Sequence, residues 1–170
     1  MSIIQQPTQT PIVEQIAQKI RQRLGEIDQE AGFQTTASSV VRPTRLGGFS
    51  PDDYQIILTQ GAKTENKQLS CDGNPRSVAW NQIFVISAEL LPSKKDRRPI
   101  DLLRSTFEAD IIVAFTAGQL GDWAQWDGLA VYSELSSATP TIEAETTISG
   151  VQLNLLVIYR VSETNPYELR

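Results

Sequence analysis

The chain has 170 residues, is 40% hydrophobic, and carries a formal net charge of −5 with one cysteine and no histidine. This length suits a single domain, residues 1–170, with a core of its own. The acidic balance argues against nonspecific nucleic-acid binding, which depends on Lys and Arg neutralising phosphates. Without histidine, Ser-His-Asp and Cys-His mechanisms are excluded, and Cys71 alone can form neither an intrachain disulfide nor an ordinary structural zinc site.

Sequence motifs for nucleotide binding, secretion and membrane insertion are also missing from the chain. It contains no phosphate-binding or dinucleotide-binding glycine loop, and its apolar stretches fall far short of the roughly 20 residues of a membrane span. Paired carboxylates remain, because Glu143 and Glu145 would share one strand face, although an exposed acidic face usually serves solubility. We therefore expect no enzyme activity, no catalytic residues, no cofactor, no metal and no membrane contact.

The first predicted element is an amphipathic helix that follows a short flexible arm at residues 1–9. Thr10 is a good N-cap and Pro11 suits the first helical position, while Gly32 suits the C-terminal stop. Gly25 would lie inside this helix and weaken it by ~1 kcal/mol relative to alanine. The helical spacing places one apolar stripe on Ile12, Ile16, Ile20, Leu24, Ile27 and Ala31.

Three strands are predicted next, from their content of β-branched and aromatic residues. They cover residues 39–42, 54–60 and 81–90. A turn is expected at residues 47–51, and a long polar loop at residues 61–77. Loops of this length inside a compact domain are usually functional or disordered.

A second helix is predicted from Pro99 to Ala117, with Gly118 as its stop. Its central Ile111-Ile112-Val113 is β-branched, so a strand remains an alternative for that interval. The expected apolar stripe of the helix is Leu103, Phe107, Ile111, Ala114 and Phe115.

Strands are then expected at residues 129–135, 141–148 and 151–160, followed by a flexible polar arm at 162–170. In the last strand every odd position is apolar or aromatic, and Leu156 and Ile158 add apolar side chains to the even face. A central strand covered on both sides would explain this pattern, and so would an even face buried in an oligomer. The order of elements predicts an α+β fold with a mostly antiparallel sheet flanked by two main helices.

The end of the chain carries a short motif, Val157-Ile158-Tyr159-Arg160-Val161 followed by Asn165-Pro166-Tyr167. It resembles the terminal strand and arm of bacteriophage tail terminator proteins of the lambda type, a tail completion family of minor tail proteins. The order of elements along most of the chain is similar too. The literal motif is confined to these eleven residues.

The resemblance implies a virion protein of the tail and neck, assembled in the host cytoplasm. Members form a hexameric ring that caps the head-proximal end of the tail tube, stops tube growth and offers a docking surface for the head. The implied partners are further copies of the chain, the tail tube protein, a head–tail connector or stopper protein, and the sheath protein if the tail is contractile. DNA would meet the ring only in passing through its lumen.

We expect the assembly interface to draw on two tryptophans, the last strand and the C-terminal arm. For the tryptophans a place in the core is the alternative, because Trp is common both in cores and at binding hot spots. Tyr159 and Arg160 could equally be an internal Tyr and a surface Arg, and the arm could be a disordered terminus. The residues expected at the interface are Trp123, Trp126, Leu156, Ile158, Tyr159, Arg160, Pro166 and Tyr167.

Three other functions stay open at the level of sequence. One is a different neck or tail component, such as a head–tail stopper or a tail tube protein. Another is a cytosolic binding module with no phage role. The third is a small hydrolase that uses paired carboxylates.

Overall fold

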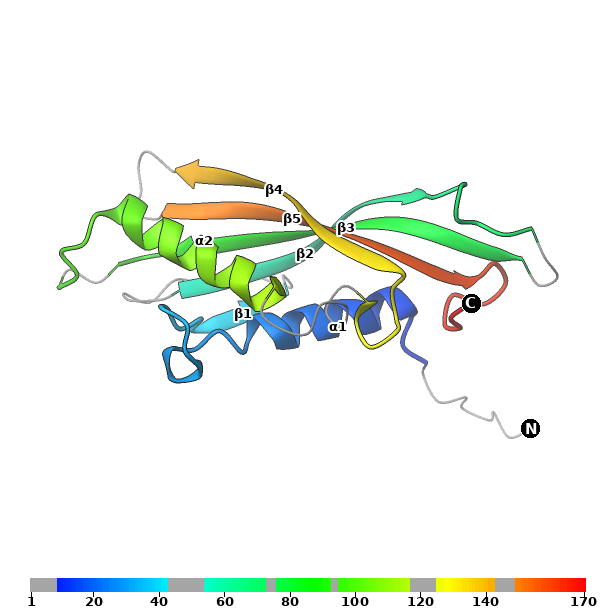
Figure 1. The fold of residues 1–170 in the computed structure, drawn as a ribbon, viewed down its shortest axis with the longest axis horizontal. Helices are drawn as coiled ribbons and strands as arrows, with labels where there is room; N and C mark the ends of the chain where they lie inside the picture. Colours follow the sequence, from blue (N-terminus) through cyan, green and yellow to red (C-terminus); the bar gives the residue numbers. More distant parts are fainter. Residues whose placement is uncertain (1–8, 43–53, 73–75, 93–94, 117–124, 143–148) are drawn as a thin grey trace, which may run out of the picture.

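In the computed structural model, two helices pack on a five-stranded, mostly antiparallel sheet, which confirms the predicted α+β class (Figure 1). The structure describes residues 9–42, 54–72, 76–92, 95–116, 125–142 and 149–170. The elements are α1 (Ile12–Leu24), the 3-10 helix η1 (Gln29–Ala31), β1 (Ser39–Val41), β2 (Tyr54–Glu65), β3 (Ser77–Leu90), α2 (Ile100–Thr116), β4 (Tyr132–Ile142) and β5 (Ser149–Ser162).

The strands lie in the order β1-β2-β3-β5-β4. Only the short edge strand β1 runs parallel to its neighbour, β2. The longest pairing joins β3 to β5, in unbroken register from Ser77 opposite Ser162 to Leu90 opposite Ser149. These long strands make an elongated, twisted sheet whose one end extends past both helices (Figure 1).

The inner face of the sheet carries the core together with both helices. Alternate residues of β3 and β5 point toward the helices, as the period of two requires. The predicted stripe of α2 is buried in full, and the buried odd positions of β5 match the expected pattern. The largest fully buried side chains come from both layers: Ile16, Ile20, Leu24, Ile56, Leu58, Phe84, Ile86, Leu90, Phe107, Phe115 and Tyr159.

The opposite, outer face of the sheet is covered by neither α1 nor α2. Ile83 pairs with Leu156 on this face. Val85 is two residues from Ile83 along β3, and Ile158 is two residues from Leu156 along β5, so both share the same face. All four side chains are half-buried, and none belongs to the core cluster. Neither described helix therefore supplies the second cover that one of the two explanations for the even positions of β5 requires.

The first helix is shorter than predicted. It ends at Leu24 with Gly25 as its C-cap, and Gly32 adopts a φ of 96° after η1 instead of ending α1. The predicted N-cap is wrong as well, because Pro11 occupies that position without a side-chain cap. The N–H of Ile12 instead donates to the carbonyl of Pro166 at 3.3 Å, so the C-terminal segment supplies the missing acceptor.

One predicted loop and one predicted strand also have different bounds in the structure. Residues 61–65 continue β2 and Ser77 begins β3, so the predicted loop at 61–77 shrinks to 66–76. The predicted strand at 129–135 begins only at Tyr132, and β4 runs on through Ile142. The turn at 47–51, Gly118 and most of the predicted strand at 141–148 lie outside the described residues.

The C-terminal segment folds back on the sheet and is no free arm. The Ser162 N–H donates to the Glu168 carbonyl at 3.1 Å, and the Glu163 N–H donates to the Arg76 carbonyl at 3.0 Å. Asn165 organises the turn, because its side-chain oxygen accepts from the Tyr167 N–H at 3.1 Å. The segment therefore ties the end of β5 to the starts of β3 and α1.

Asp110 anchors α2 to the segment that follows α1. Although it is 5% exposed, its carboxylate accepts from the N–H of Gln34 at 3.2 Å and from the N–H and hydroxyl of Thr35 at 2.7 and 2.6 Å. Hydrogen bonds to a charged acceptor are stronger than neutral ones. The carboxylate thus holds the loop before β1 against the helix.

We expect Asp110→Asn to lower the free energy of unfolding by about 1.5–3 kcal/mol, because an amide cannot accept all three hydrogen bonds. Urea denaturation measures the change. Glu30→Gln, which neutralises an exposed carboxylate in η1, is the matched control and should change stability by less than about 0.5 kcal/mol. Equal effects of the two substitutions would contradict the anchoring role.

Candidate functional site

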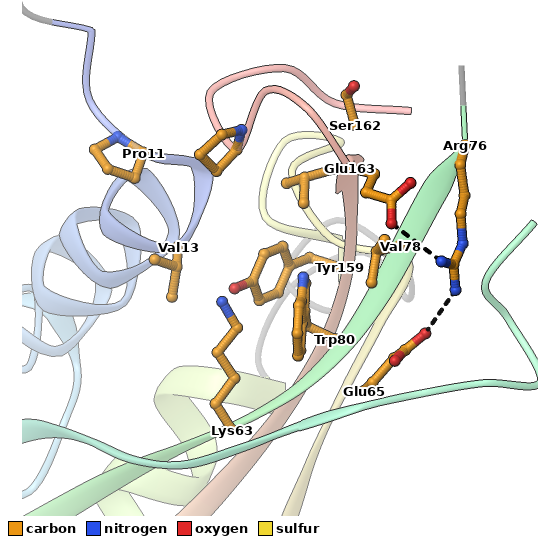
Figure 2. Close-up of a pocket in the computed structure, with 12 residues that line it drawn as sticks. Pro11, Val13, Lys63, Glu65, Arg76, Val78, Trp80, Tyr159, Ser162 and Glu163 are labelled. Atoms are coloured by element: carbon orange, nitrogen blue, oxygen red, sulfur yellow. Dashed lines mark hydrogen bonds and ion pairs between the residues drawn. The ribbon is translucent and has the colours of Figure 1, made fainter. Parts of the chain in front are cut away.

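A cleft of about 330 Å³ opens on the inner face, at the end of the sheet that α2 does not reach (Figure 2). Its walls come from the start of α1, the ends of β2, β3 and β5, and the C-terminal turn. The lining residues include Pro11, Val13, Lys63, Val78, Trp80, Tyr159 and Pro166.

A β-bulge in β2 places Lys63 in this cleft. The register shifts between Gln60 and Lys63, so that Lys63 lies opposite Gln82 on the inner face. The bulge leaves backbone carbonyls without ladder partners. The buried amide of Gln82 donates to the carbonyls of Gly61 and Ile83 at 3.1 and 2.8 Å, which satisfies this part of the hairpin.

The Lys63 ammonium lies beside two aromatic rings. Its Nζ is 4.3 Å from the ring centroid of Trp80 and 5.6 Å from that of Tyr159. Both distances fall within the range of cation–π attraction. Partial burial lowers the pKa of Lys63 from its usual value.

Tyr159 points its hydroxyl into the same space (Figure 2). The residue is 2% exposed, and its hydroxyl has no hydrogen-bond partner among the described residues. Burial raises the pKa of Tyr159 to about 12, because the charged phenolate is disfavoured away from water. The cleft therefore contains a buried donor with no acceptor.

Arg76 occupies the rim and gathers the nearby carboxylates. Its guanidinium lies 3.0 Å from Glu163 and 3.4 Å from Glu65, and it also reaches Asp72 at 3.3 Å (Figure 2). These ion pairs join the ends of β2, β3 and β5. Both carboxylates that line the cleft, Glu65 and Glu163, thus contact the same guanidinium.

The structure divides the residues expected at the assembly interface. Leu156, Ile158 and Arg160 lie half-buried on the outer face of β5. Pro166 and Tyr167 are exposed on the folded C-terminal turn, with Pro166 at the edge of the cleft.

Two of the expected interface residues are internal. Trp126 is 4% exposed, stacks edge-on against Phe115 at 5.9 Å and donates to the Ser133 hydroxyl at 2.8 Å. It belongs to the core, which is the alternative that the sequence left open for the tryptophans. Tyr159 is buried as well, in line with the alternative of an internal Tyr, and Trp123 lies outside the described residues.

Sequence reasoning missed Lys63, Arg76 and the buried Asp110. Lys63 and Arg76 fell in the predicted loop, where charged residues carry no signal of a site. A carboxylate on the apolar side of a helix stripe was the one available hint for Asp110, since buried carboxylates need partners.

In the ranges that the structure describes, no group of three or more Cys, Asp or Glu side chains could hold a metal ion. No helix in those ranges is long and apolar enough to span a membrane.

No protein-family model matches this chain, and no curated protein matches it.

Tyr159→Phe tests the unpartnered hydroxyl. We expect the substitution to raise the free energy of unfolding at pH 7 by about 1 kcal/mol, because a buried hydroxyl without a partner is costly. Urea denaturation measures this, with Tyr132→Phe on the exposed edge strand as the control. A loss of stability above about 1 kcal/mol would mean that the hydroxyl has a partner.

The same variant should change the response to alkali. Since the folded pKa of Tyr159 is about 12, above its ordinary value of 10, folding favours the neutral phenol: stability is unaffected by this group below pH 10 and is lost as pH rises from 10 through about 12. Unfolding free energies measured from pH 9 to 12 should therefore fall more steeply for the wild type than for Tyr159→Phe. Parallel curves would contradict the raised pKa.

Proposed function

We propose that this chain is a structural subunit of a phage tail that forms a ring at the head-proximal end of the tail tube, ends tube growth and receives the head. The chain-wide resemblance to tail terminator proteins suggests the role. The observation that carries the proposal is a pair of different apolar patches on opposite sides of the two-layer fold.

The outer-face patch consists of Ile83, Val85, Leu156 and Ile158, at the centre of the sheet face that neither helix covers. The edge strand extends it, because Tyr132 pairs with Ile158 and is 45% exposed. Apolar groups gathered on one face are typical of a surface that another protein covers.

The helix patch consists of Leu102, Ile112 and Val113 on the side of α2 that faces away from the sheet. These residues are 52%, 38% and 44% exposed. They lie opposite the buried stripe, which packs on the inner face.

Two unlike patches on opposite sides favour a head-to-tail contact between copies. In such a contact the helix patch of one subunit covers the outer-face patch of the next. Contacts of this kind close into rings when the rotation between subunits allows it, whereas one self-complementary patch gives a dimer. The net charge of −5 also suits a ring around a passing genome, since an acidic lumen does not retain DNA.

Tail length is the direct test of the function. Particles assembled without this chain should show overlong tails, or tails unjoined to filled heads, by electron microscopy. Tails of normal length joined to heads would contradict a terminator role.

Two charge substitutions test the contact. Leu156→Asp and Val113→Asp should each abolish rescue of such particles, because each would bury an unpaired charge in the contact. The matched controls are Gln152→Asp, at an exposed polar position of β5, and Gln22→Asp, on the exposed face of α1. Rescue by both patch variants would contradict the head-to-tail contact.

Mixing purified variants distinguishes head-to-tail from self-complementary contacts. Each patch variant retains one intact patch, so Leu156→Asp and Val113→Asp together should form pairs that cannot extend or close. Analytical ultracentrifugation of the mixture would detect the pairs. Rings from the mixture would contradict the arrangement.

A further inference from the structure

The cleft at the end of the sheet holds a cation that no carboxylate neutralises. Lys63 makes no ion pair with any residue that the structure describes. The carboxylates nearest to it in the lining, Glu65 and Glu163, are engaged by Arg76. The lining carries no net charge, with two cations and two carboxylates, and Lys63 is its cation without an ion-pair partner.

A second donor points into the same space. Tyr159 is 2% exposed, and its buried hydroxyl has no hydrogen-bond partner among the described residues. Buried polar groups are nearly always hydrogen-bonded, so an unpartnered one facing a cleft indicates an absent acceptor. Figure 2 shows this hydroxyl and the Lys63 ammonium on the same side of the cleft.

Part of the remaining lining is apolar, and the other part consists of Glu65, Arg76, Ser162 and Glu163. Val13, Val78 and Pro166 line the cleft beside the Trp80 ring, and the volume of about 330 Å³ is at the small end of ligand pockets. One ammonium without an ion-pair partner and a neutral phenol match a singly charged acceptor. Aliphatic walls match a short hydrocarbon stem.

We propose that this cleft binds a carboxylate on a short aliphatic stem, with the Lys63 ammonium and the Tyr159 hydroxyl as its two donors. The stem lies against Trp80 and the aliphatic wall. Either a free short-chain acid or the side chain of a glutamate in another polypeptide presents this chemistry. The proposal goes beyond assembly and does not rest on it, since the cleft lies on the inner face, away from the outer-face patch.

The test uses the whole chain, labelled with ¹³C and ¹⁵N at lysine, and follows the Lys63 side-chain signals by NMR. Sodium butyrate is the free-acid probe, N-acetylglutamate amide is the polypeptide probe, and butyramide is the uncharged control. We expect saturable shifts at Lys63 with a Kd of about 10 mM or tighter for at least one acid, and none with butyramide. Saturation by the glutamate probe alone assigns the site to a polypeptide ligand.

Two variants test the donors. Lys63→Met should abolish saturation, followed in this case by the indole signal of Trp80. Tyr159→Phe should weaken binding about tenfold or more, as expected for a lost hydrogen bond to a charged group. Lys67→Met, in the exposed turn after β2, is the matched control and should bind as the wild type does.

Three results would overturn the proposal. These are no saturable shift with either acid, equal binding of butyramide and butyrate, or wild-type binding by both Lys63→Met and Tyr159→Phe. Unfolding free energies of the variants, measured alongside, separate a lost site from a lost fold.

Discussion

The pairing of β3 with β5 is the constraint on which the other features of this molecule depend. It is continuous over the full length of both strands, and it assigns every residue of the two strands to one of two faces. One face receives both helices and becomes the core. The other face keeps its apolar centre uncovered, and the far end of the same pairing carries Trp80 and Tyr159 into the cleft.

The periodicity of apolar residues predicted the elements that are buried on one face. The stripe of α2 and the alternation in β3 and β5 were correct, because burial on one face leaves a regular local trace. Residues 61–65 leave no such trace. They are polar, and they are strand only because β3 pairs with them across a hairpin, a non-local cause that local composition does not reveal. The end of α1 at Leu24 was missed because the apolar spacing continues to the buried Ile27 beyond the helix.

The cleft was less accessible to sequence reasoning than the fold. Lys63 and Tyr159 lie far apart in the chain, and only the strand order brings them to one end of the sheet. The terminal motif did include Tyr159, but the alternation of β5 places this side chain on the inner face, where it is buried. The motif's Asn165 and Pro166 also have an internal role, since they shape the C-terminal turn and supply an acceptor to α1. The residues of this short motif therefore have a structural role in the C-terminal turn, beside the cleft.

The bulge in β2 makes the character of the cleft depend on the length of one hairpin arm. The extra residue between Gln60 and Lys63 turns Lys63 to the inner face. If β2 paired regularly with β3 past Gln60, Ala62 would lie opposite Gln82, and Lys63 would fall opposite Asn81 on the outer face, beside the apolar patch. The bulge thus keeps the alternation of β2 in step with that of β3 beyond Gln60, and a single backbone irregularity decides whether the lysine charge lies in the cleft or on the exterior.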